Sequence, residues 1–168
     1  MLVLSVKVGL AQRVLYDRTK DGVRTVAMTG KTFDIHMRSH KVSLTGVVYN
    51  DETIYMIDVY TYVEISENSK LVFTLFDGEE VALNAVNKSD GYVLMIPTLG
   101  SMMPVIPFPN NTGRYEISTE QLNKIFASGI QSMKISSGSD SRDRTWKKDK
   151  LGIFLKNSFD KLQLRLEK

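Results

Sequence analysis

TIYMIDVYTYVEI (residues 53–65), KLVFTLF (70–76) and EEVALNAV (79–86) follow one another and decide the fold class. Alternate side chains of a strand point to opposite faces of a sheet, so a period of two in hydrophobicity indicates a half-buried strand. The drier face of the first run is expected to face the core and comprises Tyr55, Ile57, Val59, Thr61, Val63 and Ile65. Asp77-Gly78 separates the other two runs and is a strong hairpin signal, because both residues tolerate positive φ. The stretch therefore predicts an antiparallel sheet.

Short runs with strand character continue on both sides of this stretch. Turn residues such as Gly22 and Asn50-Asp51 separate them, which favours a meander of closely spaced strands. The runs cover residues 13–17, 23–28, 32–38, 42–49, 92–96, 115–117 and 131–135. Residues 136–144 are polar, and we interpret them as a linker.

Two helices are predicted in the C-terminal third. Ser118 and Gln121 match a capping box and Gly129 is placed to end a helix, so a short helix is expected over 119–128. A second, amphipathic helix is expected from about 145 to 166, with Gly152 marking a close approach to the sheet. Its apolar stripe comprises Leu151, Phe154, Leu155, Phe159, Leu162 and Leu166.

These elements predict an α+β fold that is mainly antiparallel β. We expect a sandwich or partly open barrel of about eight or nine strands, with both helices packed on it. A pleckstrin-like barrel plugged by the C-terminal helix is the alternative. The 168 residues suit a single domain over 1–168.

The composition excludes several classes of site. The chain has no cysteine, which rules out disulfides, thiolate metal sites and cysteine nucleophiles. A net charge of +3 is too small to indicate nucleic-acid binding by itself. The sequence contains no glycine-rich phosphate loop of the usual types and no apolar run of the length of a membrane span. We therefore predict no cofactor and no transmembrane helix.

Residues 1–11 are apolar and have two interpretations. They fit a first β-strand, interrupted by Lys7, and they also fit the remnant of a signal peptide that is cleaved before Gln12. The second interpretation predicts a periplasmic or secreted protein, and a true start at Met1 predicts a cytoplasmic one. The N-terminal residue of the native protein distinguishes the two.

The histidines suggest a candidate catalytic set of Asp34, His36 and His40. With Arg38 these residues alternate with Phe33, Ile35 and Met37, which favours a strand with a solvated polar face. On a strand the two histidines lie about 13 Å apart, too far for one metal. On a helix they would be about 6 Å apart along the axis, as in zinc-binding His pairs. A metal-assisted or other hydrolase is therefore an alternative function, although no metal site is predicted.

A basic segment surrounds Trp146. Its cations are Arg142, Arg144, Lys147, Lys148 and Lys150. Cations beside an aromatic ring suit phosphates and stacked bases, so this segment predicts an alternative function in nucleic-acid or anionic-surface binding. Interspersed charge at the start of a helix, with Trp146 packed inward, explains the same residues and makes nucleic acid the less favoured partner.

The segment 97–109 is irregular and apolar, and it contains all four prolines of the chain. Prolines do not fit a regular central strand, and long irregular segments often carry function. We therefore predict that this loop contacts a protein partner or a second copy of the chain, unless its side chains cover the core. The candidate partner-binding residues are Leu99, Met102, Met103, Val105, Ile106 and Phe108.

Three runs in the C-terminal half carry a family resemblance: RYEISTEQL (114–122), GIQSMKI (129–135) and WKKDKLGIF (146–154). Residues 114–160 resemble small uncharacterised proteins of gut Bacteroidota, many of which are exported. The resemblance implies export and the lack of an obvious activity, and it assigns no functional residue. With no convincing catalytic set, the sequence favours a non-catalytic binding or interaction module of unknown ligand.

Overall fold

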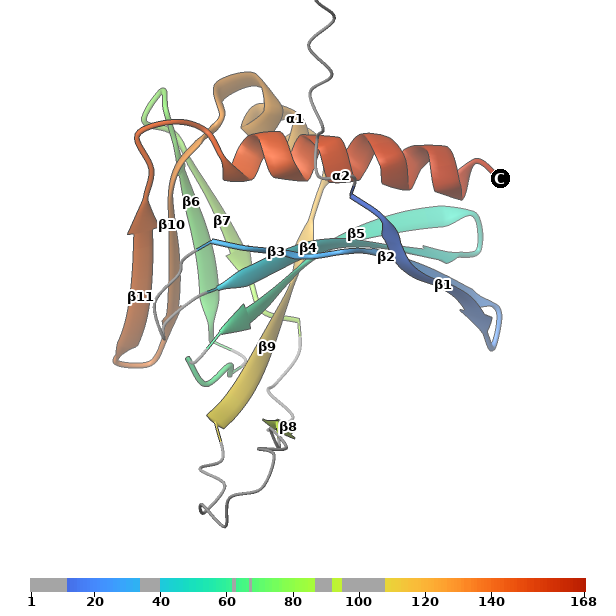
Figure 1. Cartoon of the computed structure of the whole chain (residues 1–168), viewed down its shortest axis with the longest axis horizontal. Helices are drawn as coiled ribbons and strands as arrows, with labels where there is room; N and C mark the ends of the chain where they lie inside the picture. Colours follow the sequence, from blue (N-terminus) through green and yellow to red (C-terminus); the bar gives the residue numbers. More distant parts are fainter. Residues whose placement is uncertain (1–11, 34–39, 62, 67, 87–91, 95–107) are drawn as a thin grey trace, which may run out of the picture.

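The computed structural model describes residues 12–33, 40–61, 63–66, 68–86, 92–94 and 108–168, with the backbone alone at 92–94 and 108–111. Two antiparallel sheets and two helices make up this part of the chain (Figure 1). The mainly antiparallel fold class predicted from the sequence is confirmed. The described residues form eleven strands, a few more than expected.

The larger sheet has seven strands in the order β1-β2-β4-β5-β9-β8, with β3 paired to β4. Every pairing in it is antiparallel. The strands are β1 (Val14–Lys20), β2 (Val23–Met28), β3 (Lys31–Thr32), β4 (Lys41–Tyr49), β5 (Glu52–Thr61), β8 (Tyr92–Leu94) and β9 (Phe108–Ile117).

The smaller sheet has four strands in the order β11-β10-β6-β7. They are β6 (Lys70–Leu75), β7 (Glu80–Asn84), β10 (Ile130–Ser137) and β11 (Asp140–Thr145). An isolated bridge between Ala85 and Tyr115 links the end of β7 to β9, and the Val86 N–H donates to the Arg114 carbonyl at 2.8 Å. The sheets do not close into a barrel, so the pleckstrin-like alternative is wrong.

The predicted turns connect β1 to β2 and β4 to β5. Asp21 and Gly22 have φ of 51° and 78°, and Asn50 and Asp51 have φ of 49° and 64°. Two successive residues with positive φ are typical of the two-residue hairpin turn whose twist matches that of the strands. Residue type at these four positions therefore sets the pairing register of both hairpins.

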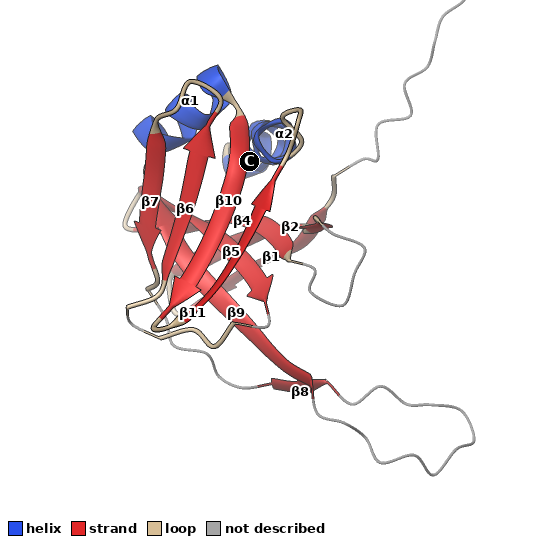
Figure 2. Cartoon of the chain, turned by 90° about the vertical axis from the view of Figure 1, so that its left-hand side faces the viewer, coloured by secondary structure: helices blue, strands red, loops and turns tan. Residues whose placement is uncertain are grey.

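The helices α1 (Thr119–Ser128) and α2 (Leu151–Leu166) lie at the same end of the two sheets (Figure 2). The capping box of α1 is present, with the Gln121 N–H donating to Ser118 Oγ at 3.1 Å and the Ser118 N–H to Gln121 Oε1 at 3.0 Å. Helix α2 crosses β2 and β4 (Figure 1). Gly46 of β4 permits this contact, because a Cβ there would lie 3.2 Å from Leu166 and 3.3 Å from Leu162.

Two sequence interpretations near the C-terminus are wrong. Residues 136–144 are not a linker, because they turn at Gly138 and pair as the hairpin of β10 and β11. The last helix begins at Leu151 and not near Thr145, which is the final residue of β11. A polar strand at a sheet edge has no alternation of hydrophobicity, so periodicity does not reveal β11.

Asp149 explains the glycine inside α2. Its carboxylate accepts the N–H of Gly152 at 2.7 Å and the N–H of Ile130 at 3.2 Å. A Cβ at Gly152 would lie 2.6 Å from Asp149 Oδ2. The close approach predicted for Gly152 therefore exists, but the neighbour is a carboxylate that joins the helix start to β10.

Pro109 lies in β9, although its segment was predicted to be irregular. Strand β5 ends at Thr61, which pairs with Asn111, so beyond that point the described partner of β9 is β8, through Val93 and its neighbours. Proline is tolerated where one edge of a strand needs no ladder hydrogen bond. The regular part of β9 therefore begins seven residues earlier than residue 115, where it was expected (115 − 108 = 7).

The core lies between the sheets and beneath α2. It contains the predicted stripe of α2, of which Phe159 and Leu166 are partly exposed. The side chains predicted for the inner face of residues 53–65 are all buried, although Val63 and Ile65 follow the end of β5 at Thr61. Trp146 is 6 % exposed and its ring packs edge-on against Phe33 at 5.8 Å. The inward packing of Trp146 is therefore confirmed.

We expect Tyr115→Phe to stabilise the protein by about 1 kcal/mol, because a buried hydroxyl without a partner costs free energy. Tyr115 is 0 % exposed, and its hydroxyl makes no hydrogen bond to any described group. Burial raises the pKa of Tyr115 to about 12. The control is Tyr55→Phe, which removes the hydroxyl that Gln163 contacts and should lose about 1 kcal/mol. Urea unfolding measures both changes, and a loss of stability in Tyr115→Phe would contradict the expectation.

Arg24 ties the end of α2 to the first hairpin. Its guanidinium donates to both carboxylate oxygens of Asp17, at 3.0 and 2.9 Å, and to the Arg165 carbonyl at 3.1 Å. Arg165 also donates to Asp17, at 2.7 Å. The hydrogen bond from Arg24, with that from Arg165, holds the pKa of Asp17 below its usual value. These contacts satisfy a carbonyl at the helix C-terminus that has no partner within the helix.

We expect Asp17→Asn to reduce the loss of stability in acid. The pKa of Asp17 is lower in the folded protein than in the unfolded chain, so its carboxylate stabilises the fold above the unfolded pKa of about 3.9. That contribution disappears as the pH falls through the folded pKa. Unfolding free energies between about pH 5 and pH 2 measure the slope, with the exposed Asp160→Asn as control. An unchanged slope in Asp17→Asn would show that the three residues do not couple.

Candidate functional site

The face of the seven-stranded sheet opposite α2, here the outer face, carries a polar cluster. On β5 the residues Ile57 and Val59 face the core, so Asp58 between them points to the outer face. Asp58 stands opposite Ser43 of β4 and Arg114 of β9. Neighbours that are directly opposite point to the same side of a sheet. The pairing register therefore brings three distant segments of the chain together on this face.

Asp58 is a buried carboxylate that bonds to two side chains of the described residues. Its side chain is 7 % exposed, Thr45 Oγ1 donates to Oδ2 at 2.8 Å, and Arg114 Nε donates to Oδ1 at 2.7 Å. The side chain of Arg114 is 42 % exposed. A buried charge requires such partners, because its loss of hydration costs free energy. The cluster therefore has a buried acidic floor and a cation that reaches the surface.

Two tyrosines belong to the same cluster. Tyr60 follows Asp58 on the outer face of β5, and Tyr16 stands opposite Ala27 at the far edge of the sheet. Lys41 lies over the ring of Tyr60 at 5.5 Å, and Arg18 lies over that of Tyr16 at 5.4 Å. We call Tyr16, Thr45, Asp58, Tyr60 and Arg114 the outer-face cluster.

The outer face is curved, as Figure 1 shows and as an electrostatic interaction between its edges indicates. Four strand-to-strand spacings separate β1 from β9, a distance of about 19 Å in a flat sheet. Tyr16 of β1 nevertheless acts on the pKa of Tyr60 and of Arg114. Figure 1 shows β1 and β9 bending to the side of β4 and β5 that faces away from α2. The curvature therefore brings the two edges of the sheet towards Arg114.

The charges in the cluster shift two pKa values. Burial raises the pKa of Tyr60, and the neighbouring carboxylate of Asp58 raises it further. Burial acts to lower the pKa of Arg114, but the hydrogen bond and the charge of Asp58 outweigh it, so the pKa lies above its usual value. Arg114 is thus a permanent cation, and Tyr60 is a neutral hydroxyl at physiological pH. The cluster can donate hydrogen bonds to a ligand without a change of protonation.

The candidate catalytic set is described only in part. Asp34 and His36 lie outside the described residues, as does Arg38. His40 is 5 % exposed, so it does not belong to the solvated polar face expected for it, and its carbonyl accepts the Phe33 N–H at 2.9 Å. The described residues contain no group of three or more His, Cys, Asp or Glu side chains arranged around a common metal position. The hydrolase alternative stays a prediction.

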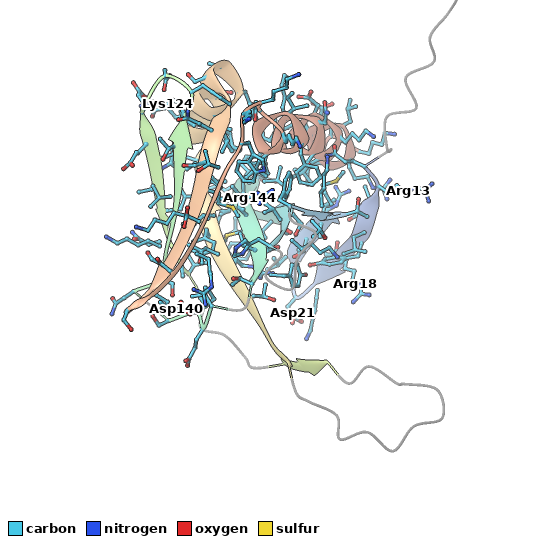
Figure 3. All side chains as sticks on the ribbon, turned by 60° about the vertical axis from the view of Figure 1, so that its left-hand side comes forward. Arg13, Arg18, Asp21, Lys124, Asp140 and Arg144 are labelled. Atoms are coloured by element: carbon cyan, nitrogen blue, oxygen red, sulfur yellow. The ribbon has the colours of Figure 1, made fainter. Side chains whose placement is uncertain are left out.

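The basic segment is split between a strand and a turn. Arg142 and Arg144 stand opposite Ile135 and Met133 of β10 and so face the inner side of the four-stranded sheet. Figure 3 shows Arg144 between the sheets, whereas Asp140 lies at the hairpin end of β11. Lys147, Lys148 and Lys150 are exposed before α2, and Arg142 pairs with Asp140 at 3.0 Å. The ring of Trp146 is buried and does not offer a surface on which a base can stack. Of the predicted anion-binding features, the segment therefore presents its cations alone.

The apolar loop 97–109 falls largely outside the described residues. This applies to Leu99, Met102, Met103, Val105 and Ile106, and only the backbone of Phe108 is described, at the start of β9. Partner binding through this loop therefore stays a prediction. Within the described part of the chain, neither helix is both long and apolar enough to cross a membrane.

Asp58 and Tyr60 lie on the less apolar face of their strand, and neither was a candidate from the sequence. Arg114 appeared only at the start of a run that carries a family resemblance. The available signal was an aspartate in the middle of a long apolar strand, since a charge there needs a partner. The identity of that partner depends on the register of β9, which periodicity does not give.

Comparisons with protein-family models, with curated proteins and with solved structures find no match for this chain. The chemistry of the outer-face cluster is therefore the guide to what the protein binds.

Proposed function

We propose that the protein is a non-catalytic binding module that contacts its ligand through the outer-face cluster. The observation that carries the proposal is the Asp58–Arg114 pair, which has a buried carboxylate and a 42 % exposed guanidinium side chain. The hydrophobic core does not need an ion pair on this face. Departures from the pattern that favours stability are concentrated at functional sites, so a ligand is a physical reason for the pair.

The geometry supports binding over catalysis. A Thr hydroxyl hydrogen-bonded to a carboxylate is an arrangement also found in nucleophilic catalysis. Here Thr45 is 0 % exposed, so its hydroxyl lies beneath the surface that a substrate would reach. Both oxygens of Asp58 accept a hydrogen bond from another side chain. The groups of the cluster that reach the surface are donors, as a binding site requires.

NMR titration with two phenyl compounds tests the proposal. Phenyl phosphate and a phenyl glucoside share a ring and differ in their polar group, and hydrolysis of either releases phenol. We expect at least one to shift the amide signals around Thr45, Asp58 and Arg114, with a Kd on the order of 1 mM for so small a probe. No phenol should appear. Release of phenol would contradict a non-catalytic role, and the absence of shifts with both probes would overturn the site.

The predicted contact of loop 97–109 with a protein partner or a second copy is compatible with this proposal. A binding module commonly carries its contacts on loops supported by a rigid sheet. The export implied by the family resemblance is likewise compatible, because neither the cluster nor the core depends on a cysteine.

A further inference from the structure

The cations around the outer-face cluster indicate the chemistry of its ligand. Arg114 uses Nε–H to bond Asp58, which fixes the plane of its guanidinium group. A guanidinium carries five N–H donors in a rigid fork that matches a carboxylate or a phosphate. The side chain of Arg114 is 42 % exposed, so it reaches the surface in an orientation that its bond to Asp58 fixes.

Two more cations of the described residues lie on the same face as Arg114, each held over an aromatic ring. Lys41 and Arg18 each lie over a tyrosine ring of the cluster, and ring faces attract cations. Lys41 stands opposite Tyr60, and Arg18 stands opposite Thr25, which in turn pairs with Val47 of the outer face. The bend of β1 and β9 in Figure 1 therefore places these cations on the same curved face as Arg114, in agreement with the effect of Tyr16 on the pKa of Arg114. Among the described residues near Arg114, the carboxylates are that of Asp58, which is bonded to Thr45 and Arg114, and that of Glu116, two residues further along β9.

Apolar side chains border the charged groups. Ile54 and Met56 of β5 and Val47 of β4 point to the outer face and are half-buried. With the rings of Tyr16 and Tyr60 they provide flat apolar contact beside the guanidinium. A ligand that is only a small inorganic ion would leave this surface in water, whereas an apolar body would cover it.

We propose that the ligand is an organic oxyanion, with a carboxylate or phosphate group bound at Arg114 between Arg18 and Lys41 and with an apolar body over the adjacent side chains. The inference rests on the proposed function and adds the charge and the shape of the ligand. The carboxylate and phosphate groups share the chemistry that a guanidinium recognises.

The experiment compares phenyl phosphate, benzoate, inorganic phosphate and the neutral phenyl glucoside by NMR titration. We expect phenyl phosphate or benzoate to bind about tenfold more tightly than the glucoside, since charged hydrogen bonds are the stronger ones. Inorganic phosphate should bind more weakly than phenyl phosphate because it lacks the apolar body. Raising the salt concentration from about 0.05 M to about 0.5 M should weaken the binding of the anions, because salt screens the attraction between exposed charges.

Two matched double variants locate the site without disturbing the buried pair. Arg18→Gln with Lys41→Gln should weaken phenyl phosphate binding about tenfold. Lys147→Gln with Lys148→Gln removes the same charge from the other candidate anion surface and should have no effect on phenyl phosphate binding.

Glu116→Gln removes a repelling carboxylate from the outer face and should tighten phenyl phosphate binding about twofold. Lys124→Gln, at the far end of the molecule in Figure 3, controls for net charge.

The outcomes separate this inference from the proposed function. If the glucoside shifts the cluster signals and the anions do not, the binding module stands and the oxyanion is wrong. If both double variants weaken binding equally, or only the Lys147–Lys148 variant does, the anion does not bind at the cluster. If no probe shifts these signals, both the proposed function and the inference are wrong.

Discussion

Gly129→Ala is expected to destabilise the protein by about 3 kcal/mol, because backbone strain and a side-chain clash coincide at this residue. Gly129 has φ of 73° and ψ of 161°, a region that is essentially restricted to glycine. A Cβ there would lie 2.8 Å from Asp149 Oδ2. That carboxylate bonds the N–H groups of Ile130 and Gly152, so moving it would disturb the starts of both β10 and α2.

Gly22→Ala is the matched control for this prediction. Gly22 has φ of 78°, and a Cβ there would meet nothing within 4 Å, so only the backbone strain applies. We expect a loss of about 1 kcal/mol for that variant. Urea unfolding of both variants gives the comparison. Equal losses would show that Asp149 moves aside without cost and that its two hydrogen bonds contribute little.

The elements with a strong local signal were predictable from the sequence. The inner face of β5, the turns at Gly22 and Asn50-Asp51, the hairpin at Asp77-Gly78 and the capping box of α1 each depend on residues close together in the chain. The structure confirms all of them. Local signals are reliable here because residue type alone sets the backbone conformation of such a turn or cap.

The hairpin of β10 and β11 was missed for a physical reason. Strand β11 is an edge strand in which Arg142 and Arg144 alternate with polar residues, so neither face has an apolar pattern. Charged side chains on an edge protect it against pairing with another chain. The Gly138-Ser139 pair between two strand-length runs was the usable signal, because Gly-Ser is a hairpin dipeptide.

The candidate site was the least predictable part. Asp58 and Arg114 are 56 residues apart in sequence, and only the pairing of β5 with β9 brings them together. That pairing skips β6, β7 and β8 in the chain, so no short-range pattern encodes it. The sequence-derived candidates were chosen for proximity along the chain, which explains why they did not include this pair.

Arg114→Gln is expected to destabilise the protein by about 2–3 kcal/mol. Removal of one member of a buried ion pair leaves an uncompensated charge and typically costs about 3–5 kcal/mol. The lower figure applies here because water reaches the partly exposed side chain of Arg114 and screens the remaining charge of Asp58. Thr45 would be left as the donor to that carboxylate. Urea unfolding of the variant measures the loss.

A double-mutant cycle separates the pair from its surroundings. Asp58→Asn with Arg114→Gln removes both charges and retains groups that form hydrogen bonds, so we expect this double variant to be more stable than Arg114→Gln alone. The coupling energy should be about 2 kcal/mol. The Lys156–Asp160 pair on the surface of α2, 3.2 Å apart and exposed, is the control and should couple by about 0.5 kcal/mol. Equal coupling in the two cycles would mean that Asp58 is solvated, and the outer-face cluster would then lack the fixed guanidinium on which oxyanion binding depends.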